Sequence, residues 1–237
     1  IKEKNINAVY EKKVSDEKDL RTIINDLKNS KIAGINVTLP FKKTVIPFMD
    51  KLTALAEETQ SVNTIYKKDY KIIGDNTDVG GFENALKYIN YNVKNKKIFI
   101  LGAGGVAPSI ITALKKLGTS EIFLSNRTKK KAEDLKYIFP DIKIINWGEL
   151  TDFDMIINAT SLGLKKNEEI KLDFRKIGSN KLFYDVIYNP KKTNFLTKGE
   201  ELGNEIENGK MMFIYQAQLA FKIWHDILPD VNDKLLD

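Results

Sequence analysis

Two short polar stretches stand out because their side chains could move a proton. The first, GINVTLPFKKT, places Asn36, Thr38 and Lys42 around the end of an apolar stretch typical of a strand. The second, GDNTDVGG, places four polar residues, from Asp75 to Asp78, just before a helical pattern. Taken alone, Lys42 could be another surface lysine and Asp78 a helix cap. Taken together, a lysine and a carboxylate can supply the proton donor that reduction of a carbonyl requires.

A glycine-rich stretch, ILGAGGVA, indicates a dinucleotide site. Gly102, Gly104 and Ala107 fit the pattern G-x-G-x-x-G/A between an apolar strand and a helix. The first glycine permits a tight turn, the second lets a pyrophosphate approach the backbone, and the small third residue lets helix and strand pack closely. Gly105 adds flexibility. The helix amides then face the phosphates; the alternative is a glycine-rich turn that binds nothing.

The next strand, EIFLSN, ends in the cationic run NRTKKK. At this position an acid accepts hydrogen bonds from the adenosine ribose and favours NAD, whereas an arginine accommodates the 2′-phosphate of NADP. Arg127 offers a planar fork for phosphate oxygens, Thr128 can donate a further hydrogen bond, and Lys131 lies one helical turn on. The alternative is a helix start decorated with solvated lysines. We expect NADP.

Composition excludes several other kinds of site. The 237 residues include no cysteine and one histidine, His225, to which we assign a packing or surface role. We therefore expect no metal site with nitrogen or sulfur ligands and no Ser-His-Asp triad. The net charge of +6 comes from lysines scattered over every segment, which favours anionic small ligands over nucleic acid. No apolar run approaches the ~20 residues that a membrane span needs.

Alternating strand and helix patterns predict an α/β fold with two domains. We expect an N-terminal α/β substrate domain over residues 1–92, to which residues 211–237 return, and a C-terminal Rossmann-type, doubly wound parallel sheet over 93–210. Strand patterns occur at 6–13, 31–40, 97–101, 121–126, 142–145, 154–160 and 181–188, with a hairpin over 62–78 that turns near Lys68 and Asp69. Helix patterns occur at 16–29, 78–90, 107–118, 129–139 and 210–228, with helical pieces over 41–59.

Motifs along the whole chain resemble those of the shikimate dehydrogenase family. NVTLPFK, VNT, GDNTD, GAGGVAPS, SNRT, NATSLG, IYNP and YQAQLAF follow one another in this order. The resemblance implies a cytoplasmic, NADP-dependent oxidoreductase that reversibly reduces 3-dehydroshikimate to shikimate in aromatic amino-acid biosynthesis. It leaves a homodimer open.

The resemblance also implies roles for individual residues. Lys42 falls on the catalytic acid/base, and Asp78 on its partner, which also contacts the substrate. The other implied substrate contacts are Thr38, Asn63, Tyr188 and Gln216. The implied cofactor contacts are Gly102, Ala103, Gly104, Gly105, Val106, Asn126, Arg127, Thr128, Lys131, Thr160, Val186 and Gly209.

One family motif does not occur in this sequence. Members open with a strand and a serine-bearing loop of the kind HSLSP, which binds the substrate carboxylate. We therefore expect the quoted chain to begin after that element. One rival reading is a quinate/shikimate dehydrogenase that accepts NAD, against which NRTKKK argues. The other is a dinucleotide-binding module without chemistry, against which Lys42, Asp78 and Asn63 argue, because such a module needs no proton donor.

Overall fold

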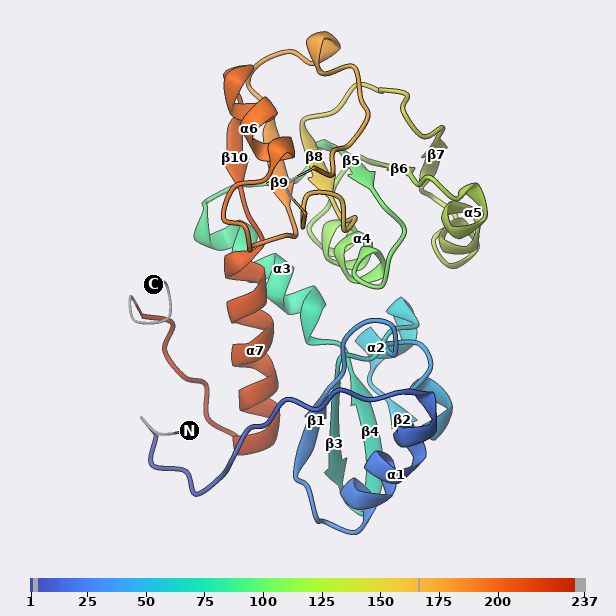
Figure 1. Cartoon of the computed structure of the whole chain (residues 1–237), viewed down its shortest axis with the longest axis vertical. Coiled ribbons are helices and arrows are strands. Elements are labelled where there is room, and N and C mark those ends of the chain that lie inside the picture. Colours follow the sequence, from blue (N-terminus) through green and yellow to red (C-terminus); the bar gives the residue numbers. More distant parts are fainter. Residues whose placement is uncertain (2–3, 166, 233–237) are drawn as a thin grey trace.

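A computed structural model describes residues 1, 4–165 and 167–232. It contains two separate β-sheets joined by a pair of long helices (Figure 1). The four-stranded sheet is built from the first third of the chain and the six-stranded sheet from the middle and later parts. In the part of the chain that the structure describes, no helix is both long and apolar enough to span a membrane.

The four-stranded sheet has the order β1-β3-β4-β2. Strands β3 and β4 form an antiparallel hairpin, and its turn residues Asp69 and Tyr70 have φ values of 48° and 64°. Such left-handed pairs give turns whose twist matches that of the flanking strands. The elements of this part of the molecule are α1 (Glu17–Lys28), β1 (Gly34–Asn36), η1 (Ile46–Phe48), β2 (Lys51–Leu52), α2 (Ala54–Thr59), β3 (Thr64–Lys68) and β4 (Lys71–Asp75).

The six-stranded sheet is entirely parallel, with the order β10-β9-β8-β5-β6-β7. Chain order reverses between β5 and β8, and ligands bind at such a switch point, outside the carboxyl ends of the strands. Its strands are β5 (Lys97–Leu101), β6 (Glu121–Ser125), β7 (Lys143–Ile145), β8 (Met155–Asn158), β9 (Leu182–Asp185) and β10 (Glu205–Glu207). Its helices are α4 (Ala107–Lys116), α5 (Lys129–Ile138) and α6 (Asn194–Glu201), with a short η2 (Phe174–Lys176).

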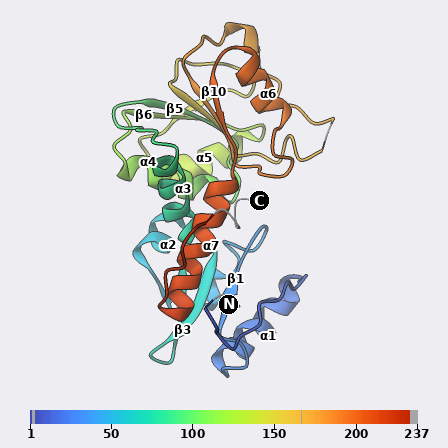
Figure 2. The same ribbon diagram turned by 90° about the vertical axis from the view of Figure 1, so that its left-hand side faces the viewer.

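Helices α3 (Thr77–Tyr88) and α7 (Lys210–His225) lie between the two sheets and pack against each other (Figures 1 and 2). Val79 and Phe82 of α3 and Met212 of α7 are buried in one cluster with side chains of β5 and α4. A separate cluster, which includes Leu27 and Ile65, forms the core of the four-stranded sheet. Trp224 of α7 donates a hydrogen bond to the Ile65 carbonyl oxygen of β3 at 3.2 Å, so α7 contacts the four-stranded sheet as well as the cluster beside the parallel sheet.

The expected strand at 6–13 is wrong, since residues 6–16 lie outside helices and strands. Val9 and Tyr10 are 83% and 65% exposed, so this alternating pattern faces solvent. The strand expected over 31–40 is shorter, limited to Gly34–Asn36, because the chain turns from residue 39. Helix α6 and strands β2 and β10 were not expected; both strands are short and lie at sheet edges.

Candidate active site

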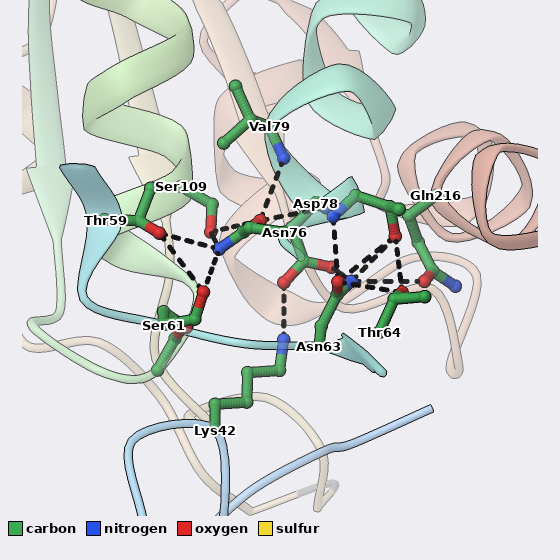
Figure 3. Close-up of polar contacts among 12 residues, drawn as sticks. Lys42, Thr59, Ser61, Asn63, Thr64, Asn76, Asp78, Val79, Ser109 and Gln216 are labelled. Carbon is green, nitrogen blue, oxygen red and sulfur yellow. Dashed lines mark hydrogen bonds and ion pairs between the residues drawn. The ribbon is translucent and has the colours of Figure 1, made fainter. Parts of the chain in front are cut away.

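Lys42 and Asp78 meet at the junction of the two halves. Lys42 lies in the turn after β1, and Asp78 is the second residue of α3. Lys42 Nζ lies 2.5 Å from Asp78 Oδ2, and the two side chains are only 12% and 8% exposed. A pair so removed from water needs further hydrogen bonds to offset desolvation. Asn63 Nδ2 donates one to Asp78 Oδ1, at 2.9 Å (Figure 3).

Asp78 is not the cap of α3, so that alternative is wrong. The cap is Asn76, whose Oδ1 accepts hydrogen bonds from the backbone N–H groups of Asp78 and Val79 at 3.1 and 3.3 Å. Because Asn76 satisfies these first-turn amides, the Asp78 carboxylate is available to Lys42 and Asn63. The position of Asp78 in the first turn also favours its negative charge.

Asn63 and Gln216 border the pair from two further elements. Asn63 is 3% exposed, and its Oδ1 accepts the backbone N–H of Thr77 at 2.8 Å, which fixes the amide orientation. Gln216, on α7, places Oε1 3.5 Å from Asn63 Nδ2. Thr38 is exposed at the start of the loop that carries Lys42. The backbone bond from Val37 N to Asn63 O, 2.7 Å long, ties that loop to β3.

A cleft of about 710 Å³ opens at the switch point of the parallel sheet. Leu39, from the loop that carries Lys42, also lines it, so the cleft reaches the Lys42 side of the molecule. Of the residues implied for cofactor or substrate, it is lined by Gly102, Ala103, Gly104, Gly105, Val106, Asn126, Arg127, Thr128, Lys131, Thr160, Val186 and Tyr188.

The glycine loop is shaped by close contacts on two sides. Gly102 has a φ of +106°, and a Cβ there would lie 2.7 Å from Thr160 Cγ2 and 2.8 Å from the Ala159 carbonyl oxygen. A Cβ on Gly105 would lie 2.6 Å from Leu39 Cδ2. A side chain at Gly105 would displace the side chain of Leu39, which belongs to the loop that carries Lys42.

The end of β6 presents donors and positive charge to the cleft. Asn126 Oδ1 accepts the backbone N–H of Ala103 at 2.9 Å, and its Nδ2 donates to Thr128 O at 2.8 Å, which joins the cationic run to the glycine loop. Thr128 is the N-terminal cap residue of α5, yet its hydroxyl makes no capping bond. Arg127 and Lys131 are exposed, and neither forms an ion pair within the described part of the chain.

These features fit NADP. The backbone of the glycine loop and the start of α4 suit a pyrophosphate. The guanidinium of Arg127, the ammonium of Lys131 and the hydroxyl of Thr128 suit a phosphate group on the adenosine ribose. Thr160 and Val186 line the cleft past the ends of β8 and β9.

Tyr188 and Gly209 take up different positions. Tyr188 lines the cleft and stacks on Phe213 of α7, with ring centroids 4.7 Å apart. Gly209 does not line the cleft; a Cβ there would lie 2.1 Å from the Val186 carbonyl oxygen. Gly209 therefore lets the start of α7 approach the Val186 backbone.

Sequence reasoning missed a buried carboxylate beneath the cleft. Asp185, fully buried at the end of β9, accepts hydrogen bonds from Asn158 Nδ2 at 3.0 Å, Ile187 N at 2.9 Å and Thr193 Oγ1 at 2.6 Å. Burial raises the pKa of Asp185 to about 6. Asn158 Oδ1 in turn accepts the Thr160 hydroxyl at 2.7 Å. The only sequence signal was an aspartate at the end of an apolar strand.

Family models match most of the chain. Residues 1–65 match the shikimate dehydrogenase substrate-binding domain, and residues 83–186 match the shikimate/quinate 5-dehydrogenase model. A curated shikimate dehydrogenase (NADP(+)) from Pelagibacter ubique is 56% identical over 237 residues, covering 100% of this chain and 89% of that protein. The chain belongs to the shikimate dehydrogenase family.

Solved structures of the shikimate dehydrogenase family have the same fold. One shikimate dehydrogenase, in complex with NADP+, superposes with a TM-score of 0.91 at 33% identity and covers 99% of this chain and 85% of that one. Another, from Listeria monocytogenes in complex with shikimate and NAD, gives 0.85 at 29% identity, covering 95% and 83%. The expected two-domain α/β fold with a Rossmann-type sheet is thereby confirmed.

Proposed function

We propose that this enzyme catalyses the reversible, NADPH-dependent reduction of 3-dehydroshikimate to shikimate. The observation that carries the proposal is the Lys42–Asp78 pair, 2.5 Å apart, beside a dinucleotide cleft to which the same loop contributes Leu39. Proton donor and hydride source would then face one site. NADPH, when bound, supplies the hydride.

The proton moves through Lys42 in this proposal. As the ring carbonyl carbon receives the hydride, its oxygen becomes an alkoxide and takes a proton from the Lys42 ammonium group. Asp78 holds the ammonium in place and stabilises its charge, and Lys42 regains a proton from solvent. In the reverse direction, neutral Lys42 takes the hydroxyl proton of shikimate. Asn63 keeps the second oxygen of Asp78 occupied, which fixes the carboxylate.

Polar side chains from four separate segments suit a polyhydroxylated ring. Thr38, Asn63, Tyr188 and Gln216 would orient the substrate so that its carbonyl lies near Lys42. They come from the loop after β1, the residue before β3, the segment after β9, and α7. Convergence of separate elements on one small ligand gives the fixed orientation that the reaction needs.

Two alternatives differ in testable ways. A quinate/shikimate dehydrogenase that accepts NAD has support from the Listeria monocytogenes structure with NAD, which shows that the fold alone does not choose the cofactor. The exposed Arg127 and Lys131 favour NADP here. A dinucleotide-binding module without chemistry would leave the buried Lys42–Asp78 pair without a purpose.

The division into domains and the cellular setting are further proposals. Residues 1–92 with 211–237 would carry the substrate side and residues 93–210 the cofactor side, a division supported by the two separate sheets. A cytoplasmic location and a homodimer rest on the family alone. Light scattering coupled to gel filtration would give the assembly state directly.

The decisive experiment follows nicotinamide absorbance with the purified protein. Shikimate with NADP+ should give a rise in absorbance, and NAD+ or quinate should each give a much lower kcat/KM. Equal rates with NAD+ would favour a quinate/shikimate dehydrogenase that accepts NAD. Tight NADP binding without turnover of shikimate or quinate would favour a dinucleotide-binding module without chemistry.

A further inference from the structure

A buried polar network joins the end of α2, the segment before β3, the N-terminal cap of α3, and α4. Its members are Thr59, Ser61, Asn76 and Ser109, which we call the Asn76 network (Figure 3). Their side chains are 0%, 1%, 1% and 0% exposed. In such surroundings, a polar atom that loses its partner has no water to replace it. The network therefore has a preferred arrangement.

Both ends of the Asn76 amide are engaged. Its Nδ2, which carries two hydrogens, lies within hydrogen-bond distance of three acceptors: Thr59 Oγ1 at 3.0 Å, Ser61 O at 2.9 Å and Ser109 Oγ at 3.0 Å. Its Oδ1 caps α3 by accepting the backbone N–H of Asp78, and it also accepts the Ser109 hydroxyl at 3.2 Å. Within the Asn76 network, Ser109 is the member whose hydroxyl lies within hydrogen-bond distance of both ends of the amide, so it helps to set the orientation of the cap.

Ser109 belongs to the cofactor side of the molecule. It is the third residue of α4, the helix that begins directly after the glycine loop. A second bond crosses nearby, from Ser61 Oγ to the Gly105 carbonyl oxygen at 3.5 Å. Ser109 therefore lies on the helix that follows the loop suited to the pyrophosphate. Asn76 connects it to the backbone N–H of Asp78.

We infer that Ser109 is a positioning residue for proton transfer: through Asn76 it fixes the first turn of α3, and with it Asp78, relative to the cofactor helix α4. The inference rests on the proposed function. Hydride and proton reach adjacent atoms of one carbonyl, so their sources must keep a fixed separation. The Asn76 network supplies a short, buried connection between the two.

Substitution of Ser109 by alanine tests the inference, with Thr112→Val as the matched control. Thr112 is one turn further along α4 and equally buried, and its hydroxyl has no hydrogen-bond partner among the described residues. Ser109→Ala should lower kcat about 3- to 30-fold, the effect of one buried hydrogen bond on a barrier. The KM for NADP should change less than about twofold. Thr112→Val should leave both near wild type.

Combination with Asp78→Asn separates positioning from a general structural role. If Ser109 acts through Asp78, Ser109→Ala should cost little further kcat in the Asp78→Asn background. Equal losses in both backgrounds, or a wild-type kcat in the single variant, would overturn the inference.

Amide exchange of Asp78 and Val79, followed by NMR, gives a readout independent of activity. It should accelerate in Ser109→Ala and not in Thr112→Val; unchanged exchange would also count against the inference. A wild-type enzyme inactive with shikimate would instead refute the proposed function.

Discussion

Lys42 and Lys43 are neighbours in one turn, yet their surroundings differ. Lys42 Nζ reaches the buried Asp78 carboxylate, whereas Lys43 is exposed. Removing a general acid–base group lowers rates by about 10²–10⁴. We expect Lys42→Ala to lower kcat within that range while changing substrate affinity much less. Steady-state kinetics with shikimate and NADP+ will measure both, with Lys43→Ala as control. A variant altered only in KM would make Lys42 a binding residue.

Arg127 should decide between the two nicotinamide cofactors. A hydrogen bond to a charged group is worth about 1.5–3 kcal/mol, and each ~1.4 kcal/mol is tenfold in affinity. Arg127→Ala should therefore weaken NADP binding roughly 10- to 100-fold and leave NAD binding nearly unchanged. Titration with both cofactors tests this. Arg175→Ala is a suitable control, because Arg175 is exposed and pairs with Asp173. Equal weakening of both cofactors by Arg127→Ala would refute the role.

At the residue scale, a position can be predicted from the sequence where its neighbours in the chain determine it. Arg127 follows a strand after a glycine loop, so its place at the cleft could be anticipated. The cap of α3 could not, because Asn76 and Asp78 are both good capping residues and sequence does not choose between them. Ser109 escaped notice because Asn76 is 33 residues away in the chain, and Asp185 because Asn158, 27 residues away, becomes its neighbour only after folding.

At the scale of elements, the crossing of α3 and α7 depends on a glycine. A Cβ on Gly81 would lie 2.9 Å from both Gln216 N and Met212 O, which are backbone atoms that cannot rotate away. Gly81→Ala should push the helices apart and cost about 1–3 kcal/mol of unfolding free energy. It should also weaken shikimate binding, since Gln216 would shift.

Thermal unfolding and shikimate titration measure the two effects of Gly81→Ala. Gly178→Ala is the control, because a Cβ there meets nothing within 4 Å. A Gly81→Ala variant as stable as wild type, with unchanged shikimate affinity, would show that the helices can separate without cost.

Element boundaries were predictable where burial is uniform. The central parallel strands are runs of apolar residues buried on both faces, so β5, β6, β8 and β9 were anticipated. Residues 6–13 alternate as a strand does, but alternation does not reveal whether a partner strand lies alongside. Short edge strands such as β10 carry too few residues for a pattern to be recognised.

At the scale of the whole molecule, Asp185 affects the free energy of unfolding. Its pKa is about 6 in the folded protein against an ordinary 3.8, so the folded state binds more protons between these values. The titration of Asp185 therefore lowers the free energy of unfolding as the pH rises from about 4 to 6. Above about pH 6 its contribution no longer changes with pH. Removing the charge by Asp185→Asn, which keeps the shape, should stabilise the protein at pH 8 by on the order of 2 kcal/mol.

The difference between Asp185→Asn and wild type is the quantity to follow, since other groups titrate as well. Chemical unfolding at pH values from about 4 to 8 should show that difference growing up to about pH 6.5 and then remaining level. Thr193→Val removes the hydroxyl that donates to Asp185 at 2.6 Å. It should lower the free energy of unfolding at pH 8, because the carboxylate keeps its charge. A difference for Asp185→Asn that does not vary with pH would contradict the assigned titration.

The position of α7 after the strands of both sheets has a consequence for synthesis on the ribosome. Gln216 lies 153 residues after Asn63, and every strand of both sheets precedes α7. A nascent chain stopped before Lys210 would carry the glycine loop and the cationic run, but α3 would lack the helix on which it packs. Such a product would present the apolar side of α3 to chaperones and proteases. The contact between Gln216 and Asn63 can therefore form only after α7 has been synthesised, and a chain that stops before Lys210 lacks the helix on which α3 packs.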